Sequence, residues 1–200
     1  MSGQPAPAAK PPEKKLPPTH DAHQPSRRVL EENAVDHELL RSRLGDRVLG
    51  IETAFKQTVL KAAPEHVVDV LRCLRDDPAL KFEMLTDITA VDNMRREDFE
   101  PARRFNVVYV VYSVAHKKRV RVEVSVPEQD PRVPSAAPVF KGAPWIEREV
   151  FDMFGIIFDG HPDLRRVLLP DYYEHFPLRK DYPLTGRGER DNFVRAEELE

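Results

Sequence analysis

Apolar side chains along the middle of the chain recur with the period of β-strands. In RVRVEVSV (119–126), valines alternate with polar residues, which is typical of a strand with one buried face. The stretch RFNVVYVVYSV (104–114) is apolar at both parities and predicts a central strand covered on both faces. The short AHKK segment between them predicts a hairpin. A further strand that runs into a loop is expected in ALKFEMLTDITAVD (79–92), and the polar residues 94–103 then form a long connection.

Two other segments have helical spacing. Pro64 is followed by apolar residues three and four apart, which predict a helix ending at Asp76-Asp77-Pro78; these residues are Val67, Val68, Leu71 and Leu74. Pro144 opens a second helix, about Trp145 to Phe154, and Gly155 is placed to stop it. Each helix therefore has a start signal and a stop signal in the sequence.

The segment before residue 64 is less regular. Ser26 is a candidate cap for a helix over 27–44 with Gly45 as its stop. Residues 48–60 predict extended structure with a break. We expect these elements to join the same domain as the strands.

Both ends of the chain are rich in proline. Residues 1–26 contain seven prolines and almost no bulky apolar side chains, so they cannot bury enough surface to offset the entropy of ordering, and we expect a disordered tail. Prolines divide residues 156–200 into short extended pieces. The expected organisation is thus a tail (1–26), one domain (27–155) and an extended C-terminal arm (156–200).

The element order predicts an α+β domain. Its two layers are a mixed, largely antiparallel sheet and the helices packed on it. With 200 residues the chain is long enough to bury a real core.

Composition excludes several classes of function. The formal net charge of -3 gives no reason to expect a nucleic-acid partner. Cys73 is the single cysteine, so an internal disulfide, an iron–sulfur cluster and a cysteine zinc site are all excluded. A reducing, cytoplasmic location fits this cysteine content. No apolar run approaches the roughly 18 residues of a membrane span.

Acidic residues near the last helix invite a catalytic interpretation. Glu147 and Glu149 lie two apart and point in nearly opposite directions on a helix, which disfavours paired acids. Arg148 and Asp152 are four apart and are expected to form a surface ion pair. A metal hydrolase using Glu147, Asp152 and His161 stays an alternative, although no HExxH-like pair supports it.

The arm suits an interface better than an active site. Its two basic doublets are interleaved with aromatic side chains, the types that anchor protein interfaces, and neighbouring acids cancel the field that RNA would need. The segment shows no way to fold on itself, so we expect it to become ordered against a partner. The residues of interest are Arg165, Arg166, Arg179, Lys180, Tyr172, Tyr173, Phe176 and Tyr182.

The sequence from 147 onward resembles one family closely. EREVFDMFGIIFDGHPDLRRVLLPD followed by PLRKDYPL is similar to the 30 kDa subunit family of NADH:quinone oxidoreductase (respiratory complex I). Upstream of this motif, LTDITAVD, the strands 104–126 and the prolines after them also occur in the family's order. The resemblance therefore runs from about Val29 to Leu184. The sequence departs from the family at DYYEHF, where a tryptophan and a glycine are usual, so a tight positive-φ turn is not expected there.

The resemblance implies a subunit without a redox group. It would be a structural and assembly component of the hydrophilic arm, contacting the large subunit that helps form the quinone site. The holoenzyme would use NADH, FMN, iron–sulfur clusters and a quinone, and would translocate protons. The chain would lie at the cytoplasmic face of the bacterial inner membrane, touching the membrane only through the complex. The equivalent subunit of a membrane-bound hydrogenase or related donor dehydrogenase is an open alternative.

The resemblance also implies which residues meet the partner. None is catalytic, cofactor-binding or metal-ligating. The interface positions that match the family motif are Glu147, Arg148, Glu149, Asp152, Phe154, Gly155, Gly160, His161, Pro162, Arg165, Arg166, Pro170, Tyr172, Arg179, Lys180, Asp181, Tyr182 and Pro183.

Overall fold

The computed structural model describes residues 35–188. A five-stranded sheet in the order β1-β2-β5-β4-β3 forms its centre. The strands are β1 (Val48–Ala54), β2 (Gln57–Ala62), β3 (Met84–Asp92), β4 (Phe105–Ser113) and β5 (Lys118–Val126). All neighbouring strands are antiparallel except β2 and β5, which run parallel with Thr58 opposite Val120. A small second sheet pairs β6 (Arg132–Pro134) with β7 (Ile157–Asp159).

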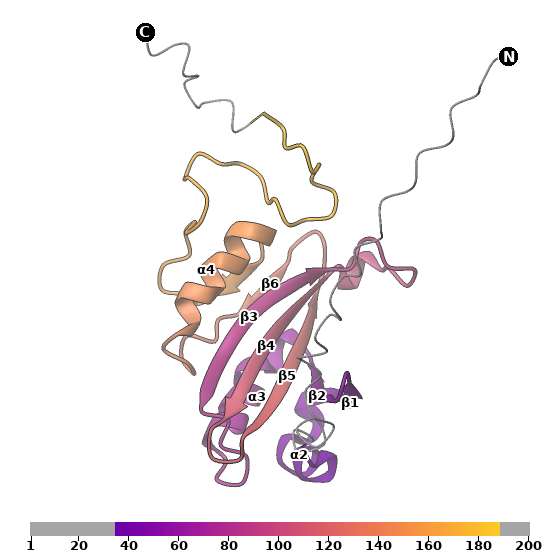
Figure 1. The fold of residues 1–200 in the computed structure, drawn as a ribbon, viewed down its shortest axis with the longest axis vertical. Helices are drawn as coiled ribbons and strands as arrows, with labels where there is room; N and C mark the ends of the chain where they lie inside the picture. The colour runs from indigo at the N-terminus through magenta and orange to yellow at the C-terminus, as the bar shows by residue number, and fades with distance from the viewer. Residues whose placement is uncertain (1–34, 189–200) are drawn as a thin grey trace, which may run out of the picture.

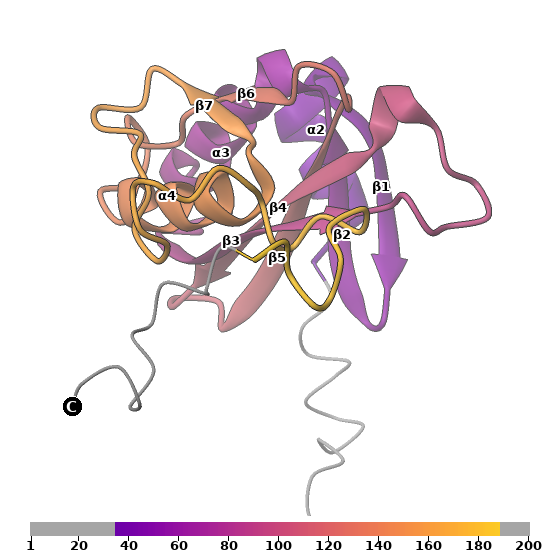
Figure 2. The same cartoon turned by 90° about the horizontal axis from the view of Figure 1, so that it is seen from above.

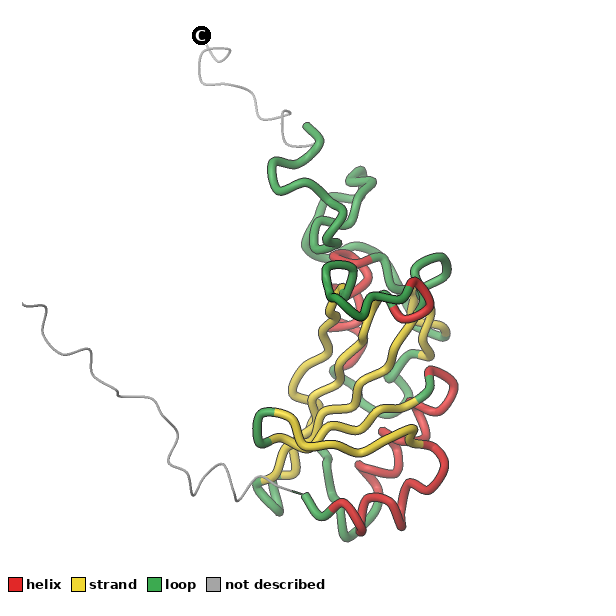
Figure 3. Tube along the Cα trace, turned by 90° about the vertical axis from the view of Figure 1, so that its right-hand side faces the viewer, coloured by secondary structure: helices red, strands yellow, loops and turns green. Residues whose placement is uncertain are grey.

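The helices lie together on one side of the sheet, as Figure 2 and the tube view in Figure 3 show. In Figure 1, α4 stands beside the edge strand β3 and α2 lies near β1 at the other end. The helices are α2 (His37–Leu44), α3 (Val67–Asp76) and α4 (Ala143–Phe154), with short 3-10 turns at Gly45–Arg47, Pro64–His66 and Pro101–Arg103. The predicted α+β fold with a mixed, largely antiparallel sheet is confirmed.

Alternating burial places the core between sheet and helices. In β5 every second residue from Val120 to Val126 is fully buried, while the residues between them are half-buried. Helix α3 buries Val67, Val70, Leu71 and Leu74 against them. A fully buried aliphatic side chain contributes about 1.5–3 kcal/mol relative to an exposed one, so this shared face dominates the stability of the domain.

The hydrophobic core continues past residue 155. Ile156 and Phe158 are buried in it, and β7 is held to the preceding loop by the hydrogen bond from the Ile157 N–H to the Pro131 carbonyl at 2.8 Å. The division of the chain at residue 155 stays a prediction about folding units, but the packed core itself includes β7.

Two predicted elements have different bounds. The expected helix over 27–44 is not continuous, because Asp36 is extended and its side chain accepts a hydrogen bond from Glu38 N–H as the cap of α2. Residues 1–34, including the predicted cap at Ser26 and the expected disordered tail, lie outside the described residues. The strand expected from residue 79 begins at Met84, since Lys81 has φ 48° and the Phe82 N–H bonds to Leu74 at the end of α3.

The described helices include none that is long and apolar enough to cross a membrane.

Candidate functional site

Helix α4 and the segment that follows it form the part of the molecule where most motif residues gather. The helix starts with Pro144 near its N-terminus and ends at Gly155, whose φ of 73° and ψ of 26° place it in the left-handed region. This ending turns the chain back so that residues 160–188, the described part of the predicted arm beyond β7, run along α4 and past the ends of β3 and β4 (Figure 1). Three groups of contacts fix the arm to the domain.

Asp152 provides the first anchor. Its carboxylate is fully buried, and its Oδ2 accepts hydrogen bonds from the backbone N–H groups of Val167, Leu168 and Leu169 at 3.0, 2.7 and 2.9 Å. Its Oδ1 accepts from Arg166 at 2.6 Å. Burial by itself raises the pKa of Asp152, but the bonds from Leu169, Arg166 and the other two amides outweigh it and lower the pKa below its usual value. Asp152 is therefore an ionised cap for the loop 167–169.

The predicted surface ion pair between Arg148 and Asp152 is wrong. Asp152 is occupied by the arm, and Arg148 instead donates to the carbonyl oxygens of Arg165 and Arg166 at 2.9 and 2.8 Å. The four-residue spacing suits a pair on an exposed helix face, but here four donors from the arm compete for the carboxylate.

Gly155 provides the second anchor by leaving space. A Cβ atom on this residue would lie 2.6 Å from Cε2 of Phe176 and 2.7 Å from an Arg179 nitrogen. The Arg179 guanidinium donates to the Phe154 carbonyl at 2.6 Å and stacks over the Phe176 ring at 4.7 Å. Phe176 in turn packs edge-on against Phe151. The arm thus lies directly on the end of α4.

Arg104 forms the third anchor. Its side chain is 1% exposed and pairs with Asp92, Glu128 and Asp181 at 2.9, 2.7 and 2.8 Å. Asp181 belongs to the arm, and the neighbouring Lys180 N–H donates to Asp92 at 2.8 Å. Burial lowers the pKa of Arg104, but bonds to Asp92 and Asp181 raise it overall, so the guanidinium stays charged. Burial by itself raises the pKa of Asp92, but the hydrogen bond from Arg104 outweighs it, so the pKa of Asp92 is lowered overall. The hydrogen bond from Arg104 lowers the pKa of Asp181 as well.

Sequence reasoning missed this Arg104 cluster. Asp92 ends one predicted strand and Arg104 begins the next, and in the antiparallel register Asp92 pairs with Phe105. Pairing the two predicted strands end to end would have brought the two charges together. Nothing in the sequence pattern, however, links either residue to Asp181.

Glu147 lies in a separate buried cluster on α4. Its carboxylate is fully buried and accepts from the Ser135 hydroxyl and the Ala136 N–H, both at 2.6 Å. Burial raises the pKa of Glu147 above its usual value despite these bonds. His161 Nε2 lies 3.9 Å from the carboxylate and 3.0 Å from the Pro144 carbonyl, while its Nδ1 accepts from the Asp163 N–H at 3.0 Å. Glu149 points the other way and is exposed, as the helical spacing predicts.

The motif residues therefore divide into two sets. Glu147, Asp152, Phe154 and Gly155 are buried and hold the chain to itself. Arg148, His161, Arg166, Arg179 and Tyr182 are half-buried, and the remaining motif residues along the arm and α4 are exposed; these are Glu149, Gly160, Pro162, Arg165, Pro170, Tyr172, Lys180, Asp181 and Pro183. Their role at a partner interface stays a prediction.

The arm does fold against its own domain, contrary to the expectation that it lacks a way to do so. Its anchors are mainly polar, which is why hydrophobic periodicity did not reveal them. Residues 171–183 are all described, and none of them has a positive φ. This agrees with the absence of a glycine at DYYEHF.

Large apolar side chains remain exposed around these anchors. Trp145 is 66%, Leu168 61%, Tyr172 66% and Leu178 50% exposed. Contiguous exposed apolar surface is typical of sites that bind other proteins, so these four residues are the candidates for such a contact in the described part of the chain.

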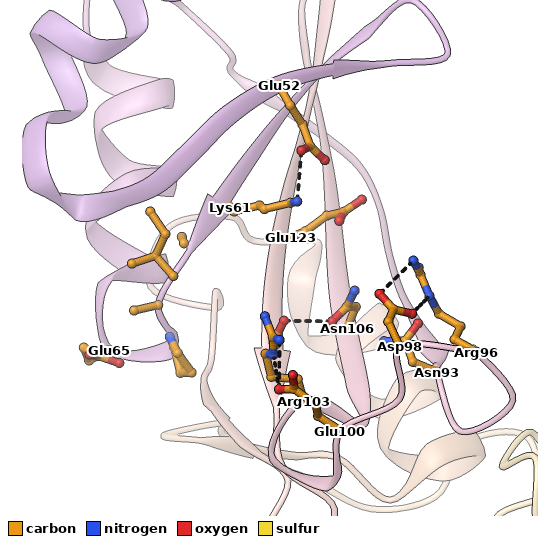
Figure 4. A pocket seen from close by; sticks show the side chains of 15 residues that line it. Glu52, Lys61, Glu65, Asn93, Arg96, Asp98, Glu100, Arg103, Asn106 and Glu123 are labelled. Carbon is orange, nitrogen blue, oxygen red and sulfur yellow. Dashed lines mark hydrogen bonds and ion pairs between the residues drawn. The ribbon is translucent and has the colours of Figure 1, made fainter.

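A hollow on the side of the sheet away from the helices is lined by many charged side chains. Figure 4 shows two of the ion pairs that line it, Glu52 with Lys61 and Arg96 with Asp98. In each pair the positive and negative charges neutralise each other. The described residues contain no group of three or more His, Cys, Asp or Glu side chains arranged to hold a metal ion.

Comparison with known proteins agrees with the motif. The model of the family described as the respiratory-chain NADH dehydrogenase 30 kDa subunit matches residues 60–188. Proteins of Brucella abortus (strain 2308) and Brucella ovis, both named as subunits of NADH-quinone oxidoreductase, are 48% identical over 147 residues, which cover 74% of this chain and 70% of theirs.

Two solved structures share the fold. A trypsin-resistant fragment (1–134) of Nqo5 aligns with a TM-score of 0.54 and 32% identity, covering 64% of this chain and 97% of that one. A chain of the membrane-bound sulfane sulfur reductase, an archaeal respiratory membrane complex, aligns with a TM-score of 0.58 over 74% of this chain and 85% of its own. Its 22% identity shows a common fold alone.

Proposed function

Because the chain belongs to the 30 kDa subunit family of respiratory-chain NADH dehydrogenase, we propose that it is a structural and assembly subunit of an NADH:quinone oxidoreductase. In this role it carries no redox group. NADH, FMN, iron–sulfur clusters and quinone bind to other subunits of the holoenzyme, and this chain adds rigidity to the hydrophilic arm of the complex.

The anchored arm is the observation that carries this proposal. The Asp152, Gly155 and Arg104 contacts fix the backbone of residues 160–188 on the domain before any partner arrives. A preorganised segment loses less conformational freedom on binding than a flexible one. The exposed side chains of Trp145, Leu168 and Tyr172 are then free to fill recesses of the large subunit that helps form the quinone site.

The saturated carboxylates argue against the metal-hydrolase alternative. Asp152 accepts bonds from three amides and a guanidinium, and Glu147 accepts from Ser135 and Ala136. A metal ion would have to displace these donors from fully buried groups. Catalytic use of Glu147, Asp152 and His161 is therefore disfavoured.

The names of the relatives favour NADH as electron donor of the complex. Proteins 48% identical to this chain are named as subunits of NADH-quinone oxidoreductase. The hydrogenase or related dehydrogenase alternative rests on the fold, which a sulfane sulfur reductase chain also has, so fold alone does not separate the donors. We place the chain at the cytoplasmic face of the bacterial inner membrane, attached through its complex.

Removing the exposed apolar side chains tests the partner contact. In the variant Leu168→Ser/Tyr172→Ser the anchors are intact, so the chain should fold normally but enter the complex less well. Complex purified through a tag on the large subunit should contain less of the variant, while turnover per assembled complex stays near wild type. Met84→Ser, which removes an apolar side chain of similar exposure (50%) from β3, is the matched control. Full incorporation of the double variant, or normal complex levels without turnover, would refute this role.

A further inference from the structure

The hairpin between β1 and β2 has an unfavourable turn. Ala54 pairs with Gln57, so only Phe55 and Lys56 connect the strands, with φ angles of 49° and 61°. Two successive residues with positive φ are typical of a type I′ turn, for which Asn-Gly is the preferred sequence. A phenylalanine in the left-handed region is strained because its Cβ crowds the backbone.

The Phe55 ring also contributes little to the stability of the chain, because it is almost fully exposed to solvent. It is 93% exposed, more than any other aromatic side chain in the described residues. Trp145, in comparison, is 66% exposed and lies under the Arg148 guanidinium at 5.1 Å. No aromatic or cation–π contact joins Phe55 to another side chain of residues 35–188. Both the backbone and the side chain of Phe55 are therefore unfavourable in the chain alone, a combination that points to a role outside it.

The hairpin lies far from the arm. In Figure 1, β1 and β2 lie at the lower right, whereas α4 stands at the upper left and the arm runs across the top. Any contact made by Phe55 is consequently separate from the arm surface. β1 is one of the two edge strands of the sheet, the other being β3, so no further strand of the described sheet lies beyond it.

We propose that the β1–β2 turn is a second protein-binding site, in which the Phe55 ring enters an apolar recess of another subunit. This rests on the proposed function, since it requires that the chain is part of a complex. Lys56 beside the ring is exposed, and Glu52, an acidic side chain on the same hairpin, is already paired with Lys61 at 2.9 Å. A carboxylate at the rim of the recess would therefore give Lys56 an ion-pair partner that the hairpin itself does not supply. A single ring with one neighbouring lysine suits a protein pocket better than a membrane surface, which takes several apolar and basic groups.

Replacing the turn separates stability from binding. Phe55→Asn/Lys56→Gly installs the preferred type I′ sequence and removes the ring. The melting temperature of the purified chain should rise by a few degrees, roughly what relief of turn strain gives in a domain of this size. Incorporation in competition with wild-type chain should fall about ten- to hundredfold, the factor expected for losing one buried phenylalanine. Val114→Ser, which removes an exposed apolar residue beside the β4–β5 turn, should change neither.

The outcomes are distinguishable. A higher melting temperature with unchanged incorporation overturns the hairpin site and leaves the proposed function intact. Failure of even the wild-type chain to enter the complex overturns the proposed function and this site with it.

Photo-crosslinking gives an independent test that needs no loss of assembly. With p-benzoylphenylalanine in place of Phe55, illumination of the purified complex should yield a crosslink to one other subunit, and the same group at position 114 should not. Crosslinks to lipid alone would assign the tip to the membrane and overturn the proposal, as would the absence of any crosslink.

Discussion

Substituting Asp152 with asparagine should free the arm without unfolding the domain. The carboxylate accepts three backbone amides on one oxygen and the Arg166 guanidinium on the other. An asparagine has the same shape but only one acceptor oxygen. Whichever way it is turned, its NH₂ group faces donors, either the amides of 167–169 or the guanidinium.

The cost follows from the burial of this pair. The side chains of Asp152 and Arg166 are 0% and 11% exposed, so water compensates little for the loss. Breaking a buried pair by removing one partner costs about 3–5 kcal/mol. Because the hydrophobic core does not involve this carboxylate, the cost should appear as local opening of the arm rather than as global unfolding.

Amide hydrogen exchange measures this opening directly. Exchange of the Val167, Leu168 and Leu169 amides should accelerate by roughly two to three and a half powers of ten in Asp152→Asn, the equivalent of 3–5 kcal/mol. Amides in β4 and β5 should keep their rates. Glu149→Gln removes the same charge from an exposed position of the same helix and is the control. Rates for residues 167–169 within threefold of wild type would refute the anchoring role of Asp152.

Three further perturbations test the other contacts. Gly155→Ala adds a Cβ at φ 73° and 2.6 Å from Phe176, so it should cost more than about 1 kcal/mol and expose the arm to trypsin; Gly142→Ala, with open space around it, should not. Arg104→Met leaves buried Asp92 uncompensated and should cost about 3–5 kcal/mol in urea unfolding, unlike the exposed Arg103→Met. Burial raises the Glu147 pKa, so its contribution to stability is present below the unfolded value and lost as pH rises through the folded one. Glu147→Gln should therefore remove the fall in stability that begins as the pH rises above the unfolded pKa of a glutamate, and an unchanged pH profile would contradict it.

The sequence predicted elements whose signals are local. Pro144 and Gly155 bracket α4 because proline suits the first turn and glycine tolerates the left-handed ending. The alternation of Val120 to Val126 predicted β5 with one buried face, and the structure confirms it. Cys73 lies half-buried in α3 with its Sγ 3.6 Å from the Arg43 carbonyl, and burial raises the pKa of its thiol.

The contacts that hold the arm could not be predicted in the same way. Asp152 meets backbone amides of residues 167–169, and Asp92 meets the amide of Lys180. Every residue except proline has a backbone N–H, so such partners leave no mark in the amino-acid pattern. The resemblance of the motif to a known family indicated that these residues matter, whereas the geometry shows that several of them act within the chain.

The parallel pairing of β2 with β5 in the central sheet has a consequence for how the polypeptide is made. The β1–β2 hairpin leaves the ribosome before the other strands of the sheet, yet β2 completes its pairing only with β5, which is synthesised after β3 and β4. Pairing two strands that are far apart in the sequence costs loop-closure entropy, and this cost is incurred before the stabilising contacts form. Until Val126 has emerged, β2 therefore keeps one edge without its partner. The nascent chain is open to wrong pairing in this interval, and β2 docking should be the late, slow event in folding.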